Sequence, residues 1–595
     1  MEVGTMYDKL DTDVLVIGSG GAGLRAAIEA AKSGCKTTII TKGKINRSGA
    51  TLLAGANISA DIECDGNSLY NMGFPTAGED DSKEKWFEEI INQGFFLNNQ
   101  KMVETYVENA PSRVKELIDW GLEVNGLESE RGISVSSKGI LDALMNKVSE
   151  YNIEQRSDMC VVDLLVNGRV NGILAVNVFT GDYVICKAKA VIIATGGWHS
   201  LYPFNAGGLD LSGDGQGMAY RAGAELMNME MVTFVPSCIL TPYIYRGSIF
   251  PYILHTMGYG HLLNKKGEQF VYDYFDSNMI ELALHTEWNK LLLSNAEFKE
   301  IKRAACLNGG VYFSMKHCPN NLFDAIKEEI PGLKYPIYSR LLQKMKEGYA
   351  IEVAPAAEYF EGGIKINENG ETSVPGLYAA GECTSGLFGA NRVSAATTEM
   401  LVQGAIAGEH AGKYVKQSEP TQVDKEYVEE LQMFLDAPFH RKTGTNPILF
   451  RKEIQRLAEE NLSAVRTQKG LEFVIKRIGE LRGKMLADIS MSSKSRIYNM
   501  QWMEFIELRN LLDVLEISSR SAMMRSESRG VHFREDYPYT DNDKWLKTIV
   551  FKNESGTPKP HLEILVTTKI MPPSGCTEYK AFIRSICEKF RREEL

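Results

Sequence analysis

DVLVIGSGGAGLRAAIEAA, at residues 13–31, decides the fold of this chain. Val14 to Ile17 are apolar without interruption, which is typical of a strand buried on both faces. Three glycines follow in the spacing G-x-G-x-x-G. Gly18 permits a tight turn, Gly20 lets a pyrophosphate approach the backbone, and Gly23 lets the next helix pack on the strand. The segment therefore predicts a dinucleotide-binding turn.

The residues after this turn indicate which nucleotide is held. We expect a helix from Leu24 to Ala31 whose free N–H groups point at the phosphates, and a second strand from Thr37 to Ile40. Many such units place an acid after the second strand to hold a ribose. Thr41 and Lys42 stand there instead, which favours FAD over NAD.

A second glycine-rich segment, GLYAAGECTSGLFGANRVSAATTEMLVQGAIAG at residues 376–408, is expected to close the same unit. ATGG at 194–197 follows another apolar strand pattern, and its small residues let backbone pass close to a nucleotide. These segments are far apart along the chain. We therefore expect a long insertion between them to cover the flavin.

Composition limits the classes of function. The 595 residues suffice for several domains, and 44% apolar with 24% charged residues is ordinary for a globular protein. A net charge of −11 without a basic stripe argues against nucleic-acid binding. The sequence has no signal-like apolar core at its start and no run long enough to insert in a membrane. We expect a cytoplasmic protein.

The ten cysteines are scattered and form no C-x-x-C pair. The chain therefore shows no iron–sulfur or haem motif of its own, and no spacing of histidines with cysteines or acids indicates a metal site. We predict no bound metal in this chain, and a reducing compartment.

The order of predicted elements gives an α/β fold class with five segments. Residues 1–235 and 353–415 form the two parts of an FAD-binding, Rossmann-type domain of the glutathione-reductase-like kind. Residues 236–352 break its rhythm and are expected to form an inserted α+β cap. Residues 420–535 show helical periodicity, and residues 536–595 form a tail with short strands.

Several motifs together resemble the flavoproteins of the succinate dehydrogenase/fumarate reductase family. The resemblance covers nearly the whole chain and rests on the glycine-rich turn, RSGAT at 47–51, ATGG at 194–197, SGDGQGMAYRAGAELMNMEMV at 212–232, LLNKKGEQFV at 262–271, APAAEYFEGGI at 354–364, GLYAAGECTSGLFGANR at 376–392 and RSESRGVHFREDYP at 525–538. The last motif belongs to the family's C-terminal helical domain, and flavoproteins that carry it normally dock on an iron–sulfur subunit.

The resemblance implies FAD, a mobile cap over the flavin, two-electron chemistry at flavin N5 and an iron–sulfur, ferredoxin-like partner. It also completes the expected cofactor site. The residues expected to contact FAD are Gly18, Gly20, Gly21, Ala22, Gly23, Thr41, Lys42, Ser48, Gly49, Thr51, Ala194, Thr195, Gly196, Asp214, Gly381, Glu382, Arg392 and Ala395.

One departure from the family concerns the cofactor. A histidine that follows the R-S pair in respiratory fumarate reductases bonds covalently to FAD. Gly49 and Ala50 occupy that stretch here, and neither can form the bond. We therefore predict non-covalent, dissociable FAD.

Three further departures concern the substrate. A substrate-binding histidine is replaced by Val235, and a second by Glu358, whose carboxylate would repel a dicarboxylate. The family's proton-donating arginine is missing, and Thr256 falls nearest its place. Arg392 is retained, and its guanidinium group can bind a carboxylate or stabilise the negative charge of a developing enolate. The sequence predicts a substrate other than fumarate or succinate.

The cap segment at 237–261 is rich in rings, which suits a bulky or aromatic organic acceptor. They are Tyr243, Tyr245, Phe250, Tyr252, His255, Tyr259 and His261. Tyr259 and His255 are the leading candidates for proton donor, ahead of Tyr359 and Glu358, with Arg392 polarising the acceptor. The predicted reaction is reduction, or formation, of an activated C=C bond in an organic acid, enone or thioester, with electrons exchanged through the iron–sulfur partner.

Alternatives remain open at this point. The chain could be an electron-transfer module without an organic substrate, or an oxidase resembling L-aspartate oxidase. RSGA and APAAEY also resemble the adenylylsulfate reductase flavoprotein, which implies sulfur-nucleotide chemistry. A site on the periphery of a membrane-bound complex is compatible with the sequence. Arg525, Arg529 and Arg534 either face a partner or form an internal ion-pair network.

Overall fold

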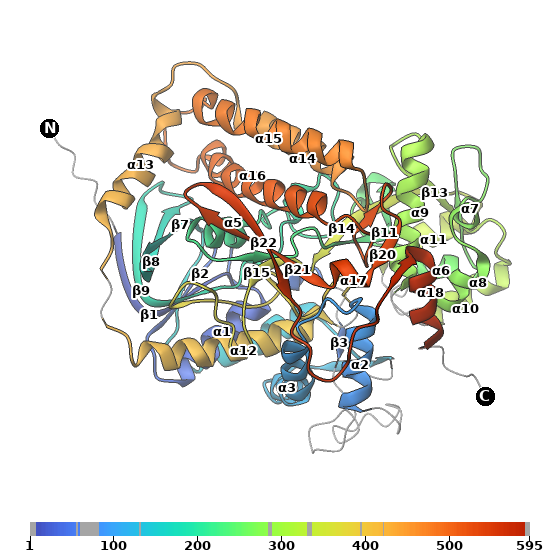
Figure 1. Cartoon of the computed structure of the whole chain (residues 1–595), viewed down its shortest axis with the longest axis horizontal. Helices are drawn as coiled ribbons and strands as arrows, with labels where there is room; N and C mark the ends of the chain where they lie inside the picture. The colour runs from blue at the N-terminus through green and yellow to red at the C-terminus, as the bar shows by residue number, and fades with distance from the viewer. Residues whose placement is uncertain are drawn as a thin grey trace.

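The computed structural model describes residues 8–54, 57–59, 82–129, 132–283, 288–329, 336–392, 395–419 and 422–589. Cys64 lies outside these ranges. In Figure 1 the main sheet and its helices lie at one end, the cap at the other, and the C-terminal helices run along the top. Among the described residues, no helix combines the length and the apolarity needed to cross a bilayer.

A seven-stranded sheet forms the frame of the nucleotide-binding domain. Its order is β6-β2-β1-β9-β8-β7, with β16 also paired to β9. β1, β2, β6, β9 and β16 run parallel, and β7 and β8 add an antiparallel edge. The strands are β1 (Asp8–Ile17), β2 (Thr37–Ile40), β6 (Glu154–Arg156), β7 (Met159–Asn167), β8 (Arg169–Asn177), β9 (Tyr183–Ile193) and β16 (Leu377–Ala379).

The apolar run of β1 is buried on both faces, as predicted. Val14 and Val16 belong to the core with α1 (Gly21–Lys32) and α12 (Ala396–Val415), whereas Leu15 and Ile17 belong to the core on the other side. α1 and α12 pack against each other, as Figure 1 shows below the sheet. The remaining helices of this part are α2 (Lys83–Gln93), α3 (Gln100–Asp119), α4 (Ser137–Ser149) and α5 (Asp214–Arg221), with the small sheet β3 (Asn57–Ser59), β5 (Gly132–Val135), β4 (Val124–Ser129).

Two long paired strands lead into and out of the cap. β11 (Val232–Thr241) enters it and β14 (Ile351–Phe360) leaves it, and the two are antiparallel neighbours in the sheet β11-β14-β13-β12. Both cap boundaries expected from the sequence, at 236 and 352, fall inside these strands. The cap also contains β12 (His261–Leu263), β13 (Val311–Ser314), α6 (Ile253–Thr256), α7 (Val271–Tyr274), α8 (Ser277–Ala283), α9 (Trp288–Ala304), α10 (Asn320–Glu329) and α11 (Pro336–Lys346).

The C-terminal part is helical and then returns to the other domains. α13 (Lys425–His440), α14 (Pro447–Asn461), α15 (Gln468–Asp488) and α16 (Met500–Met524) form the helical layer, and α16 also packs on α5. The following hairpin, β21 (Lys547–Glu554) and β22 (Thr557–Ile564), extends the sheet β17-β15-β10-β21-β22. The other strands are β10 (Leu226–Met227), β15 (Gly363–Lys365), β17 (Thr384–Ser385), β18 (Val465–Arg466), β19 (Phe533–Arg534), β20 (Tyr539–Asp541) and β23 (Cys576–Glu578), with the short helix α17 (Asn542–Trp545).

The fold class expected from the sequence is confirmed, with one helix missed in the tail. α18 (Tyr579–Lys589) packs against α8 of the cap, and its apolar side chains recur at helical spacing. That spacing was visible in the sequence. The described part of the tail therefore includes a helix against the cap as well as short strands.

Candidate functional site

The glycine-rich turn has the backbone geometry that its sequence predicts. Gly18 has a φ of +111°, and a Cβ there would lie 2.2 Å from the carbonyl oxygen of Ala194. A Cβ on Gly23 would lie 2.0 Å from the carbonyl oxygen of Gly18. The amide of Gly21 donates to Thr51 Oγ1 at 3.1 Å. Any side chain at Gly18 or Gly23 would therefore push the strand, turn and helix apart.

The two glycine-rich segments meet in space. A Cβ on Gly381 would lie 2.9 Å from the Cβ of Ala22, and a Cβ on Gly21 would overlap the sulfur of Met400 in α12. The amide of Gly381 donates to Gln403 Oε1 at 2.7 Å. Ala395 is the residue that precedes α12.

Unpaired polar atoms show that this cradle fits FAD. Ser19 Oγ, Thr195 Oγ1 and Glu382 Oε1 are buried and have no hydrogen-bond partner within the described ranges. Above Gly20, a Cβ would meet only Thr51 Oγ1, at 3.3 Å. Hydroxyls and phosphates of a dinucleotide would supply the partners that these atoms lack.

Other residues expected at FAD are held by protein groups. Lys42 Nζ lies 2.7 Å from Ser212 Oγ, 2.8 Å from Asp214 Oδ2 and 2.6 Å from Glu507 Oε1 on α16. The Lys42 ammonium lowers the pKa of Asp214 in spite of burial. This pairing ties the C-terminal helices to the nucleotide domain.

The RSGAT loop adds two further polar contacts. Ser48 Oγ donates to the carbonyl of Lys44, and the amide of Gly49 donates to Asp210 at 3.0 Å. Gly49 has a φ of +85°, and Gly196 has a φ of +71°. Contact of these residues with FAD stays a prediction.

A carboxylate between two cations lies among the residues that the sequence predicts at the substrate. Glu358, near the end of β14, accepts from Lys290 Nζ at 3.0 Å and from a terminal guanidinium nitrogen of Arg392 at 3.3 Å. Burial raises the pKa of Glu358, but the charges of Lys290 and Arg392 outweigh it and hold that pKa at about 2. Glu358 is therefore ionised at neutral pH and is already paired.

Arg392 is also held through its backbone and its ring contact. Its amide donates to Glu361 at 3.1 Å, and its guanidinium carbon lies 4.9 Å from the centroid of the Tyr359 ring. The Tyr359 hydroxyl donates to Glu399 in the first turn of α12. The structure thus brings together three of the five predicted catalytic residues, Arg392, Glu358 and Tyr359.

Three buried acids surround this group with their pKa values raised. Burial raises the pKa of Glu361 to about 7, and those of Glu382 and Glu399 to about 8. Glu382 accepts from the amide of Gly197 at 3.2 Å. Glu382 and Glu399 are therefore mostly protonated at pH 7, whereas Glu361 is about half ionised there.

His199 fixes the backbone beneath Glu358. Its Nε2 lies 2.8 Å from the Glu358 carbonyl oxygen, and because a carbonyl only accepts, Nε2 is the donor. Burial lowers the pKa of His199 to about 4, so the imidazole is neutral at pH 7.

The other two predicted catalytic residues lie in the cap, on and after α6. His255 Nδ1 is 3.1 Å from the carbonyl oxygen of Gly260, and burial lowers the pKa of His255 to about 4. Its Nδ1 therefore carries the hydrogen and its Nε2 the lone pair at neutral pH. Tyr259 is half-buried and packs on the main core. The imidazole of His255 is a poor acid in this state, which favours Tyr259 as donor.

The wall around Val235 is apolar. Val235, Cys238 and Ala356 form a small buried cluster against which Phe204, Ile249 and Tyr252 pack. The side chain that replaces the family histidine thus supplies no hydrogen bond to a substrate.

Lys290 is the member of this ion group that sequence reasoning missed. It stands in WNKLLL, where a single charge interrupts an apolar run in α9, and its side chain is 7% exposed. A buried lysine in an apolar run needs an anionic partner, so the sequence could have marked Lys290 as one half of a buried ion pair. The identity of the partner depends on how α9 packs on β14, and the sequence does not contain that.

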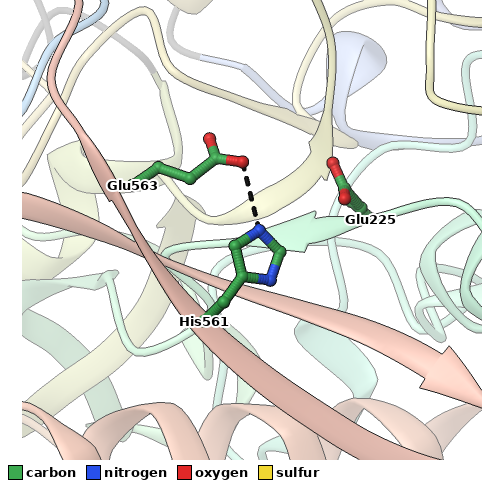
Figure 2. A group of neighbouring side chains, drawn as sticks. All are labelled: Glu225, His561 and Glu563. Carbon is green, nitrogen blue, oxygen red and sulfur yellow. Dashed lines mark hydrogen bonds and ion pairs between the residues drawn. The ribbon is translucent and has the colours of Figure 1, made fainter.

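One cluster of potential metal ligands lies away from this site. Figure 2 shows Glu225, His561 and Glu563 gathered at β10 and β22, with His561 Nε2 3.1 Å from Glu563. Lys365 Nζ lies 2.9 Å from Glu225 and 2.5 Å from Glu563. The ammonium pairs with both carboxylates, so the cluster is explained as an ion-pair group.

Family models match most of the chain. One described as FAD binding domain matches residues 13–398, and one described as Fumarate reductase flavoprotein C-term matches residues 451–578. The fumarate reductase (CoM/CoB) of Methanothermobacter marburgensis has a subunit that is 31% identical to this chain over 568 residues, which cover 91% of this chain and 97% of that protein.

Solved structures show the same architecture. A single-site variant of FrdA from Escherichia coli quinol fumarate reductase aligns with a TM-score of 0.82 at 27% identity, over 96% of this chain and 99% of that one. Adenylylsulfate reductase from Archaeoglobus fulgidus aligns with a TM-score of 0.74 at 20% identity, over 96% and 98% of the two chains. The second likeness shows a shared fold alone.

Proposed function

The chain belongs to the family of fumarate reductase and succinate dehydrogenase flavoproteins, and from that premise we propose that it reduces, or forms, an activated C=C bond in an acceptor other than fumarate. It is an FAD-dependent oxidoreductase. The proposed acceptor is an organic acid, enone or thioester, bulky or aromatic. The observation that carries the proposal is Arg392 retained beside Glu358 and Lys290, where the two family histidines are absent.

The chain's own residues bind and orient the acceptor in this proposal. FAD, when bound in the glycine cradle, supplies or accepts hydride at N5. Arg392 binds and polarises the carbonyl or carboxylate, because its fixed charge stabilises developing enolate charge. The apolar wall at Val235 and the cap aromatics hold the rest of the molecule and exclude water.

Tyr259 is the proposed proton donor. It follows α6 in the cap segment that donates the proton in the family, and the neighbouring His255 is neutral at pH 7. In the direction of reduction, the phenol of Tyr259 would deliver a proton to one carbon of the C=C bond while the other carbon receives the hydride.

The relatives are named as subunits, which supports a partner for this chain as well. We propose an iron–sulfur subunit that exchanges electrons with the flavin, in an assembly in the cytoplasm or at the periphery of a membrane complex. Co-purification of the chain with a cysteine-rich partner that carries iron would support this, and turnover with physiological electron donors without any partner would contradict it.

The test is an anaerobic dye assay. The FAD-loaded protein is mixed with reduced viologen, and dye oxidation is followed with fumarate, aryl-acrylates, enones and enoyl thioesters. Turnover with a bulky acceptor but not with fumarate is expected. Turnover with fumarate would show that Val235 and Glu358 do not disable that reaction.

Non-covalent FAD has its own test. Because Gly49 and Ala50 lack a side chain that could bond to the flavin, acid precipitation is expected to leave all flavin absorbance in the supernatant. Flavin that stays on the precipitated polypeptide would contradict the prediction.

A further inference from the structure

Glu399 and Tyr359 are buried partners from two elements that meet at the nucleotide domain. Glu399 lies in the first turn of α12 and Tyr359 lies near the end of β14, and their exposures are 2% and 5%. Glu399 Oε2 meets the Tyr359 hydroxyl. Residues expected at FAD border the pair: Arg392 lies over the Tyr359 ring, Ala395 precedes α12, and the charge of Glu382 acts on both partners.

Gln403 determines which oxygen of Glu399 carries a proton. Its Oε1 lies 2.7 Å from the amide nitrogen of Gly381, and a backbone amide only donates, so the orientation of the Gln403 side chain is fixed. Its Nε2 therefore donates to Glu399 Oε1 at 3.3 Å. The proton of a neutral Glu399 belongs on Oε2, the oxygen that faces the Tyr359 hydroxyl.

The pair consequently has two hydrogen-bond arrangements. When Glu399 is ionised, the Tyr359 hydroxyl donates to it. When Glu399 is neutral, its own O–H donates to the Tyr359 oxygen, and the hydroxyl hydrogen of Tyr359 can turn to another acceptor. Burial raises the pKa of Glu399 to about 8, so both arrangements are accessible near neutral pH.

The charged neighbours of Glu399 act in both directions. Glu361 and Glu382 raise its pKa, whereas Arg392 lowers it. The neighbouring thiol of Cys383 is buried, and its own pKa is raised. Ionisable groups of α1 and α3 meet α12 further along the helix: Arg25 at Gly404, Glu29 at Gly408 and Arg113 at Glu409. Among the described residues, Glu399 forms no ion pair, so its protonation can respond to a change of charge at the cofactor.

The proposed reaction consumes two protons for each pair of electrons. An iron–sulfur partner supplies electrons alone, so the hydride that leaves the flavin must gain its proton at the flavin. The other proton goes to a carbon of the acceptor, for which Tyr259 is the proposed donor. Tyr259 therefore accounts for only one of the two protons.

We propose that the Tyr359–Glu399 pair supplies the proton that the bound flavin takes up on reduction. Tyr359 gives its hydroxyl proton to the flavin while the carboxyl proton of Glu399 moves to the Tyr359 oxygen, and the resulting carboxylate regains a proton from solvent. Glu399 is then a positioning residue that acts through Tyr359. This deepens the proposed function and rests on it for the source of the electrons.

A cavity provides a short path by which Glu399 regains its proton. It holds about 330 Å³ of empty space between α3 and α12 and is partly open to solvent. Gln403 is one of its lining residues and also bonds to Glu399. Rotation of this one side chain would connect Glu399 to the cavity.

The test counts the protons taken up when the flavin is reduced, and no acceptor is present. The FAD-loaded protein is titrated with mediator dyes in a spectroelectrochemical cell, and the dependence of the midpoint potential on pH gives the number of protons per two electrons. Stopped-flow measurements at saturating reduced viologen give the first-order rate of flavin reduction. The variants are Glu399→Gln and Tyr359→Phe. Glu297→Gln is the control, because Glu297 is also fully buried with a pKa raised to about 8 but bonds to Ser237 on β11.

Reduction adds negative charge to the flavin, which raises the pKa of Glu399 further. Between about pH 8 and pH 9, the wild type is therefore expected to take up about half a proton more per two electrons than Glu399→Gln. Tyr359→Phe removes a hydrogen bond that lowers the pKa of Glu399, so the extra uptake is expected at higher pH. Both variants are expected to slow flavin reduction at least about tenfold, and Glu297→Gln to match the wild type.

A Glu399→Gln protein with the proton count of the wild type would overturn the proposal. Equal losses in Glu399→Gln and Glu297→Gln, or unchanged rates of flavin reduction in both pair variants, would overturn it as well. If Glu399→Gln does not fold or does not bind FAD, the pH range and the rate of Tyr359→Phe decide. Failure of the proton count leaves the proposed acceptor reduction standing, and an acceptor panel without turnover leaves this inference standing.

Discussion

Two buried ion clusters serve different ends in this protein. In one, Arg525, Arg529, Glu230 and Glu527 have fully buried side chains, with Arg525 2.6 Å from Glu230 and Arg529 2.7 Å from Glu527. In the other, the Lys290–Glu358–Arg392 group keeps up to 20% exposure and adjoins the glycine cradle. The side chains of the first cluster are closed to solvent, whereas those of the second keep a partial exposure.

The difference in exposure distinguishes a cluster of charges that stabilises the fold from one that could take part in chemistry. The closed cluster satisfies its guanidinium groups further with the backbone carbonyls of Phe95, Trp545 and Lys547. Arg525 and Arg529 therefore belong to the internal network that the sequence left as one of two possibilities, and Arg534, which pairs with Asp536, has a side chain that is buried as well. A partly exposed ion cluster near the expected cofactor site is the better candidate for a catalytic or binding role.

Arg525→Ala is expected to have the largest effect, and it tests whether the fully buried cluster stabilises the fold. The change leaves Glu230 with an uncompensated buried charge, whereas Glu527 keeps Arg529, so the free energy of unfolding is expected to fall by about 3–5 kcal/mol. Denaturant unfolding of the FAD-loaded protein measures it. Arg456→Ala, which removes an arginine paired with Glu453 and Glu460 on the exposed side of α14, is the control and should cost less than about 1 kcal/mol. Equal losses would mean that burial does not distinguish the clusters.

Arg392→Ala tests whether the partly exposed Lys290–Glu358–Arg392 group has a role in catalysis. Loss of the guanidinium removes the charge that we propose binds the acceptor, and kcat/KM is expected to fall about a hundredfold to a thousandfold with little change in FAD content. Steady-state dye kinetics and the ratio of flavin to protein absorbance provide the readouts. A variant that loses FAD rather than rate would assign Arg392 to the cofactor instead.

The smallest expected effect concerns Glu399. Burial raises its pKa to about 8, well above the ordinary value of about 4.3 in the unfolded chain. Between about pH 5 and pH 8 the folded protein keeps a proton that the unfolded chain releases, so this group makes stability fall as pH rises. Glu399→Gln is expected to reduce that slope by up to about 1.4 kcal/mol per pH unit. Unfolding midpoints from pH 5 to 9 measure it, and parallel curves for the two proteins would rule the raised pKa out.

The sequence predicted best what depends on neighbours along the chain. β2 spans Thr37–Ile40 as expected, and Gly18 has the positive φ that its motif requires, because both follow from local sterics. Glu358 and Arg392 were found through motifs. Lys290 was not, because its role depends on α9 lying against β11 and β14, a contact between segments that no local pattern specifies.

The two strands that join the cap to the rest of the chain give the ion group a mechanical role. Lys290 belongs to a cap helix, Arg392 follows the second glycine-rich segment of the nucleotide domain, and Glu358 lies between them on β14. Swinging the cap away from the nucleotide domain would separate at least one of these pairs. These ion pairs therefore link the cap to the nucleotide domain, and the free energy of opening the cap includes their strength.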